Sequence, residues 1–259
     1  MRSAILPVAL AGLSALAAVP AAAQEGRYAA DYVFSYLGFP VARATFTTQV
    51  DARGNAAIDG EVTSAGIARL FDQTEGTTSA SAAAGRDRLS PSRFDVAYVS
   101  GDKTQRVAMR FSGNRATVEL DPPMRRRRSD WIDVGPAHLQ GVVDPLTATL
   151  VKAASAEEVC AGRVIGVFDG WMRADVTLEP MSIGETAGVE GTTATCRARF
   201  APIAGYRESN RDVAYMRDRA EITVTFGQLG DSGYFAPVEA SIGTRIGTVR
   251  VRAVQIRRS

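Results

Sequence analysis

Histidine and cysteine are scarce in this chain, and their scarcity excludes whole classes of site. The 259 residues include one His and two Cys. That inventory cannot supply a multi-histidine zinc site, a four-cysteine metal cluster or a covalent haem attachment motif. We therefore expect no metal site and no cofactor.

Lysine is scarce as well, since Lys103 and Lys152 are the only lysines among 30 Lys and Arg residues. The 28 Asp and Glu residues nearly balance this arginine excess, and the formal net charge is +2. Such a balance does not create a strong basic field. We therefore expect no nucleic-acid partner.

Long apolar runs are missing after the first two dozen residues, so we expect no transmembrane segment in the mature chain. At the start, Arg2 precedes the apolar run Ile5–Val19, and Ala21–Ala23 form a small-residue cleavage pattern ahead of Gln24. This layout is typical of a secretory signal peptide. It predicts a signal peptide over residues 1–23 and a single domain over residues 24–259, periplasmic and monomeric. An N-terminal membrane anchor is the alternative, but the alanine-rich run is only weakly hydrophobic.

The two cysteines, Cys160 and Cys196, allow a single connectivity. In an oxidising compartment such a pair most simply forms a disulfide. The loop that it closes predicts a stabilisation of about 3–4 kcal/mol from lost chain entropy. A reactive thiol is the alternative, but neither a C-x-x-C spacing nor a neighbouring histidine supports it.

Alternation of apolar and polar residues indicates strands along most of the chain. Gly, Asn and Asp separate these segments at intervals of about ten residues, which is typical of an antiparallel meander. The predicted strands cover residues 28–37, 41–50, 56–64, 93–100, 103–111, 115–120, 163–168, 173–178, 192–200, 219–229, 237–242 and 248–256.

One helix is expected, over Leu146–Val159, because Asp144 can cap it and Pro145 suits its first position. Gly66–Phe71 could form a single helical turn. The predicted fold class is therefore mainly β: a highly curved antiparallel sheet or open half-barrel of ten or more strands, wrapped on one central helix.

The segment that most resembles a catalytic motif is Gly230-Asp231-Ser232-Gly233, which is similar to the nucleophile segment of chymotrypsin-like proteases. That chemistry needs a base to take the serine proton. The single histidine, His138, lies in a segment that does not match the protease family's histidine motif. Because Gly and Asp are also turn residues, we interpret the segment as a hairpin turn and expect no catalytic residues and no enzyme.

Four consecutive arginines, Arg125, Arg126, Arg127 and Arg128, could contact phosphate, lipid A or anionic sugars. The simpler interpretation is a solvated loop that Asp130 and Asp133 partly neutralise. Both interpretations remain open at this stage.

A curved sheet could hold an acyl chain or cover the strand edge of a partner. Aromatic residues could line such a cavity, but they more often fill a core. The sequence does not decide whether the concave face is a cavity or a filled core. The aromatic residues in question are Phe34, Tyr36, Phe46, Phe94, Tyr98 and Phe111.

Several segments resemble the DUF3108 family of bacterial envelope proteins, whose function is unknown. They are Tyr32–Gly38 with Ala42–Ala44, Val143–Ala148, Val167–Gly170, and Cys196 with Pro202–Arg207. The plan of that family, a curved sheet wrapped on a helix, is similar to the lipoprotein carriers LolA and LolB and to the DUF1849 family. Unlike LolB, this chain has no lipobox cysteine.

The resemblance implies a non-enzymatic periplasmic role in cell-envelope integrity, with a lipid, an acyl chain or an envelope protein as the bound partner. A purely structural interaction protein is the first alternative. The second is an envelope hydrolase that acts through Asp, Ser or Tyr without His.

Overall fold

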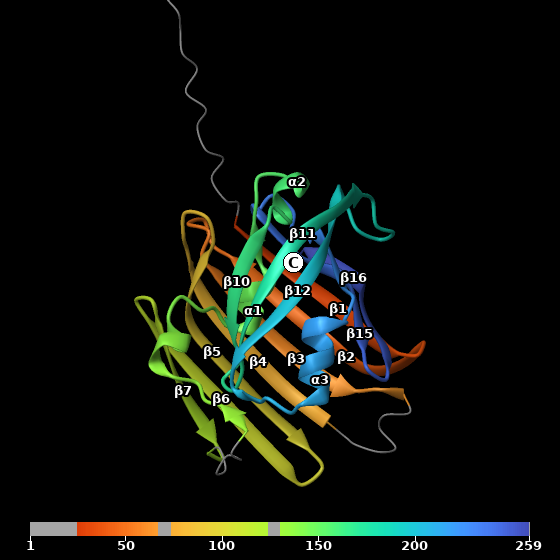
Figure 1. The fold of residues 1–259 in the computed structure, drawn as a ribbon. Helices are drawn as coiled ribbons and strands as arrows, with labels where there is room; N and C mark the ends of the chain where they lie inside the picture. Colours follow the sequence, from red (N-terminus) through yellow and green to blue (C-terminus); the bar gives the residue numbers. More distant parts are fainter. Residues whose placement is uncertain (1–24, 67–73, 124–129, 259) are drawn as a thin grey trace, which may run out of the picture.

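A computed structural model describes residues 25–66, 74–123 and 130–258, and most of them lie in strands (Figure 1). The first half forms β1 (Gly26–Tyr36), β2 (Phe39–Val50), β3 (Ala56–Ser64), β4 (Thr74–Ala84), β5 (Leu89–Ser100), β6 (Lys103–Ser112) and β7 (Arg115–Asp121). The middle forms β8 (Trp131–Ile132), η2 (Pro136–Leu139), α1 (Pro145–Thr149), β9 (Val151–Lys152) and α2 (Ala156–Val159). The last part forms β10 (Arg163–Phe168), β11 (Arg173–Gly184), β12 (Thr193–Ala204), β13 (Tyr206–Arg207), α3 (Arg211–Asp218), β14 (Ile222–Gln228), β15 (Tyr234–Thr244) and β16 (Gly247–Arg258).

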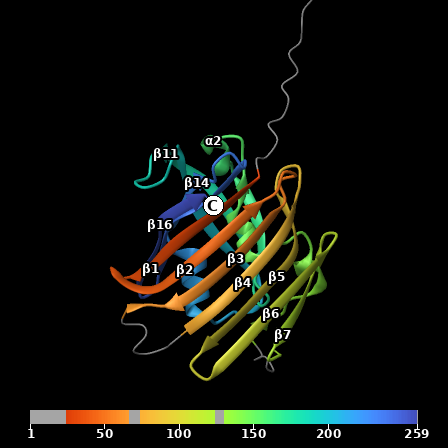
Figure 2. The same cartoon turned by 180° about the vertical axis from the view of Figure 1, so that it is seen from behind.

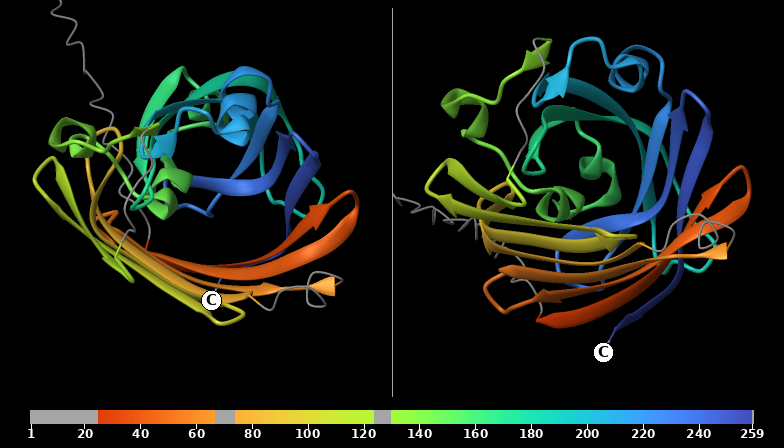
Figure 3. Two further views of the ribbon diagram at one scale, coloured as in Figure 1. Left: turned by 60° about the horizontal axis from the view of Figure 1, so that its bottom comes forward. Right: turned by 90° about the horizontal axis from the view of Figure 1, so that it is seen from below.

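One antiparallel sheet of fourteen strands contains nearly all of these strands. Its order is β10-β11-β12-β14-β15-β16-β1-β2-β3-β4-β5-β6-β7, and β9 pairs with β15. The first seven strands lie side by side in chain order (Figure 2). The sheet curls into an incomplete barrel, because its end strands β7 and β10 do not pair with each other (Figure 3). The predicted curved antiparallel sheet of ten or more strands is confirmed.

The strands form where one face of the chain is apolar. In β6, Val107 and Met109 are buried, whereas Arg106 and Arg110 are exposed. Successive side chains of a strand point to opposite faces, so this pattern places the apolar residues inside the curl. Among the described residues, no helix is long and apolar enough to cross a membrane.

The prediction of one central helix is wrong. The segment that was expected to be helical over Leu146–Val159 divides into α1, β9 and α2. Val151 and Lys152 pair with Phe235 and Tyr234 of β15. These two residues therefore satisfy their backbone groups in the sheet, where helical hydrogen bonds cannot also form.

The inside of the curl is filled at the end where α1, β9 and α2 lie. One cluster, near α2, includes Val159, Cys160 and Cys196. A second joins Leu150 of the α1–β9 link to Tyr234 of β15, and a third packs under η2 and the end of β10. Here the three short elements replace the single helix that the sequence predicted.

The opening between β7 and β10 is bridged at one corner by the segment that precedes α1. The amide of Gly141 donates to the carbonyl of Asn114 (2.8 Å), and the amide of Val143 donates to the carbonyl of Gly166 (2.8 Å). The amide of Phe168 returns a bond to Val143 (3.0 Å). The two sheet edges are thus held together without closing the barrel.

The turn between β10 and β11 packs across the opening. The predicted two-residue turn at Asp169-Gly170 is instead a four-residue loop, closed by the pairing of Phe168 with Arg173. Gly170 has a left-handed φ of 102°, and a Cβ there would lie 2.5 Å from Val107 of β6. The loop can approach β6 this closely because position 170 has no side chain.

Three predictions fall on residues outside the described ranges. They are the signal peptide over residues 1–23, nearly all of the helical turn over Gly66–Phe71, and the arginine run 125–128.

Candidate binding face on the inner side of the sheet

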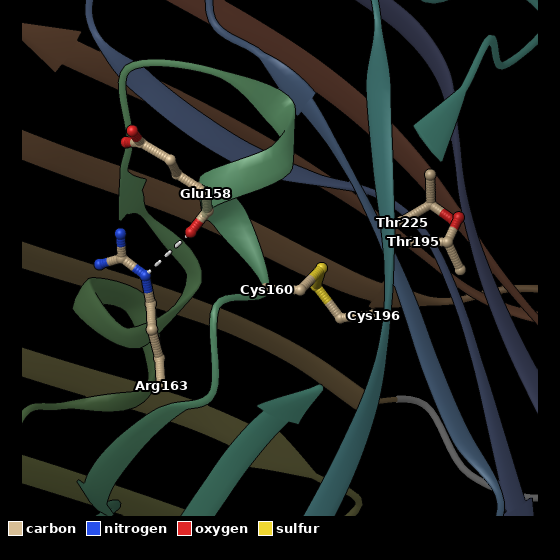
Figure 4. Close-up of a disulfide and its surroundings, with 6 residues drawn as sticks. All are labelled: Glu158, Cys160, Arg163, Thr195, Cys196 and Thr225. Carbon is tan, nitrogen blue, oxygen red and sulfur yellow. Dashed lines mark hydrogen bonds between the residues drawn. A yellow bond between two sulfur atoms is a disulfide. The ribbon is translucent and has the colours of Figure 1, made fainter. Parts of the chain in front are cut away.

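The predicted disulfide between Cys160 and Cys196 is present, with Cα atoms 5.5 Å apart. It joins the end of α2 to β12, and both residues are buried (Figure 4). On the same side, the Arg163 guanidinium donates to the Glu158 carbonyl (3.4 Å) and so fastens the chain after the bridge. Cys196 therefore marks the inner face of the sheet, toward α2.

Residues directly opposite one another in an antiparallel pair point to the same face. The register starting at Cys196 therefore defines a row of side chains across five strands of the inner face. A second row lies two residues further along each strand, away from α2. The first row continues through Val224, Ala240, Val251 and Phe34. The second contains Ile222, Ile242, Val249 and Tyr36.

We call the residues of these two rows after Cys196 the open rows. All of them are apolar or aromatic, and each is only partly buried. Ile222 and Val224 pack against the cluster near α2, whose own side chains are almost completely covered. The elements α1, β9 and α2 therefore cover one end of the inner face completely, whereas the other end, where α3 packs against β12 and β15, is only partly buried.

The same gradient runs along β5, on the opposite side of the curl. Phe94 is 3% exposed and belongs to the core, and Val96 packs partly against that core. Tyr98, two residues further on the same face, is 36% exposed. The concave face is thus a filled core at one end and a partly exposed apolar surface at the other.

The six aromatic residues singled out in the sequence divide along this gradient. Phe94 is core, and Phe46 and Phe111 pack against core clusters. Phe34 and Tyr36 belong to the open rows, and Tyr98 lies at the uncovered end. The expectation that these aromatics fill a core therefore holds for only part of the set.

Tyr32 fixes the shape of the inner face beside the open rows. Its ring meets that of Phe46 edge to face, with centroids 5.8 Å apart. Its hydroxyl passes over β16 and donates to the carbonyl of Pro237 on β15 (2.7 Å). Burial raises the pKa of Tyr32 to about 12, so the hydroxyl stays protonated as a donor at neutral pH.

The residues considered for catalysis have structural roles. Ser232 lies in the turn between β14 and β15, is fully buried, and its Oγ accepts a bond from the amide of Tyr234 (3.2 Å). His138 lies in η2, where its Nδ1 accepts a bond from the amide of Gly135 (3.0 Å). The structure therefore supports the hairpin-turn interpretation of Gly230–Gly233.

A shallow hollow of about 620 Å³ lies on the outer face of β2–β6. Its lining is rich in Thr, Ser and charged residues. Within it, Asp95 is already paired with Arg93 and Arg110. This surface is polar and does not suit an apolar ligand. In the described part of the chain, no group of three or more His, Cys, Asp or Glu residues could hold a metal ion.

Asp144 is a fully buried carboxyl at the start of α1. Its Oδ1 accepts a bond from the amide of Thr147 (2.8 Å), as predicted for a capping residue. Burial raises the pKa of Asp144, because the apolar surroundings disfavour the charged form. The ionised carboxylate therefore still caps the helix, but its buried charge destabilises the folded state.

Replacing Asp144 by asparagine is expected to raise the free energy of unfolding relative to wild type, and this gain should be larger at pH 7 than at low pH. The folded state holds the Asp144 proton more tightly than the unfolded state, so its contribution falls as pH rises above the ordinary carboxyl range. Asparagine retains a capping oxygen without that dependence. Urea unfolding of wild type and D144N from pH 3 to pH 7 measures the difference.

Asp130→Asn is the control for this prediction and should give the opposite sign. The hydrogen bond from Ser209 lowers the pKa of Asp130, so ionised Asp130 contributes stability that is lost as pH falls. If D144N and wild type keep the same stability difference at every pH, the assigned ionisation cost is wrong.

Comparisons with known proteins identify a matching family and a solved structure of similar fold. The family described as "Protein of unknown function (DUF3108)" matches residues 27–254. A solved beta-barrel-like protein of DUF1849 from Brucella abortus is similar in fold, with a TM-score of 0.58 and 10% identity. The match covers 92% of this chain and 100% of that one. No curated protein matches the chain.

Proposed function

The chain belongs to the DUF3108 family, and we propose its function from its own residues, because the family description assigns no activity. The proposed function is non-enzymatic binding of an acyl chain of a lipid on the open rows, in the bacterial periplasm, in support of envelope integrity.

The observation that carries the proposal is the incomplete cover of the inner face. Phe34, Val251 and Ile242 belong to a concave apolar surface, yet they remain partly exposed. Each methylene of a ligand that is buried there contributes about 0.8 kcal/mol. An acyl chain is slender and apolar, and it therefore fits a curved strand surface better than a polar ligand does.

Binding is favoured over catalysis because the nucleophile and base candidates are engaged elsewhere. The hydroxyl oxygen of Ser232 and one ring nitrogen of His138 have backbone partners, and the two residues lie on different elements. Neither belongs to the open rows. The alternative of a hydrolase without His would need converging polar groups on this face, where the open rows present apolar side chains.

Periplasmic location is supported by two independent features. The signal-peptide pattern over residues 1–23 indicates export. The buried Cys160–Cys196 bridge fits an oxidising compartment.

Titration with a fluorescent C16 fatty acid tests the proposal. Wild type should bind it, and Ile242→Asn should bind about tenfold or more weakly, because a polar amide would be desolvated without a partner. Ser241→Asn is the matched control, since Ser241 is the next residue on β15 and faces outward opposite Arg250. Its affinity should equal that of wild type.

Thermal unfolding of both variants separates loss of binding from loss of fold. Failure of wild type to bind the probe, or equal affinity of I242N and S241N, would contradict the proposal. Such a result would favour a purely structural interaction protein.

A further inference from the structure

At the tip of the β1–β2 hairpin, Leu37 combines an unfavourable backbone conformation with an exposed apolar side chain. Leu37 has a left-handed φ of 50°, and Gly38 follows with a φ of 86°. A two-residue turn with both φ values positive favours asparagine followed by glycine, and it is unfavourable for leucine. The Leu37 side chain is also 64% exposed, so it gains little from burial in the fold.

Two more exposed apolar side chains lie next to Leu37. Phe39 is 60% exposed on the same hairpin, and Ile246 is 70% exposed at the tip of the adjacent β15–β16 hairpin. The Tyr36 hydroxyl donates to the carbonyl of Ile246, and Leu37 lies 3.1 Å from the position that a Cβ of Gly247 would occupy. We call Leu37, Phe39 and Ile246 the apolar corner.

The two hairpins that carry the apolar corner are neighbours in the sheet because β1 pairs with β16 (Figure 3). Tyr36 pairs both with Val249 and with Phe39. Tyr36 and Val249 belong to the open rows. The apolar corner is therefore the outward continuation of the candidate binding face.

Charge within the two hairpin tips is sparse. The segment 36–42 contains no charged residue, and the segment 241–249 contains only Arg245. Arg245 is exposed and lies beside Asp212 of α3 (2.9 Å). The tips themselves thus present apolar side chains, and their single cation is paired with an acid of α3.

We propose that the apolar corner inserts into the surface of a lipid bilayer. Three protruding side chains are too few for a stable protein interface, which buries about 800 Å² on each partner. They suffice for shallow insertion, in which each side chain gains by leaving water. Docking in this orientation would place the open rows beside the lipid, and only that consequence rests on the proposed function.

Sedimentation with vesicles of phosphatidylethanolamine and phosphatidylglycerol tests the insertion. The decisive variant is Leu37→Asn, because asparagine suits the left-handed turn and should fold at least as well as wild type. L37N should bind vesicles about tenfold more weakly, and Ile246→Asn should show a similar loss.

Val164→Asn is the matched control, since Val164 is 62% exposed but lies on β10, at the far end of the strand order. Its vesicle binding should equal that of wild type. Absence of wild-type binding, or L37N binding as tightly as wild type, would overturn the insertion.

The fatty-acid titration keeps the two proposals separable. An L37N variant that binds the C16 probe normally but not vesicles supports insertion by the corner and leaves the binding face intact. Retained vesicle binding by I242N with no probe binding to any variant would contradict the proposed function alone.

Discussion

Cys160→Ser is expected to lower the free energy of unfolding by about 3–4 kcal/mol under oxidising conditions. The bridge links residues 36 positions apart, and the intervening chain includes β10 and β11. Cutting it enlarges the conformational freedom of the unfolded chain. The remaining thiol and the new hydroxyl also stay buried among apolar side chains such as Val159 and Phe226. Chemical denaturation of both proteins measures the change.

Cys196→Ser and the double variant provide the controls for the disulfide. Both should match C160S, because each removes the same single bond. In the presence of reductant that opens the bridge, wild type should lose most of its advantage. Titration of two free thiols in the native wild-type protein would refute the bridge.

Gly205→Ala is expected to destabilise the protein by about 3 kcal/mol. Gly205 has a left-handed φ of 87°, and a Cβ there would lie 1.8 Å from the carbonyl oxygen of Trp171. The substitution therefore combines backbone strain with displacement of the β10–β11 loop. That loop packs across the opening between β7 and β10, so its displacement should also loosen the contact between these two sheet edges.

Gly188→Ala separates the two contributions. Gly188 has a similar φ of 79°, but a Cβ there would meet no atom within 4 Å. The difference between the two variants in urea denaturation therefore reports the contact with Trp171. Equal destabilisation of G205A and G188A would show that the contact has no energetic role.

The parts of the fold that were predictable from sequence are those determined by local patterns. The alternation in Lys103–Ser112 indicates a strand because one side of it is buried. The bond that Asp144 accepts from the amide of Thr147 follows from a capping residue before Pro145. The disulfide followed from the predicted export and from the presence of only two cysteines.

Non-local pairing explains what the sequence did not indicate. Val151 joins β15, more than eighty residues away, and so interrupts a segment with good helical composition. Helix α3 was also missed, although Asn210 caps it by accepting bonds from Asp212 and Val213. The signal for that helix was present in the capping residue, before a short and strongly charged segment.

The open rows could not be identified from alternation alone. Val224 and Phe226 lie on the same face of β14, but only Phe226 is fully buried. The difference depends on where α2 and β9 lie, which the strand pattern does not contain. The motifs that resemble DUF3108 likewise acquire a meaning only in space. Val143 pairs with Val167, and Gly205 lies against Trp171, which directly follows the motif Val167–Gly170, so these motifs lie close together in the fold.

The pairing of β1 with β16 has a consequence for how the molecule is assembled. The hydrogen bond from Tyr32 to Pro237 spans 205 residues, and the strand pair beneath it spans a similar distance. Contacts so distant in sequence carry a large loop-closure cost and slow the folding of a β protein. Because β1 is synthesised long before β16, its edge stays unpaired until the end of the chain is made and can aggregate. We therefore expect the pairing of β1 with β16, in the middle of the strand order, to form late.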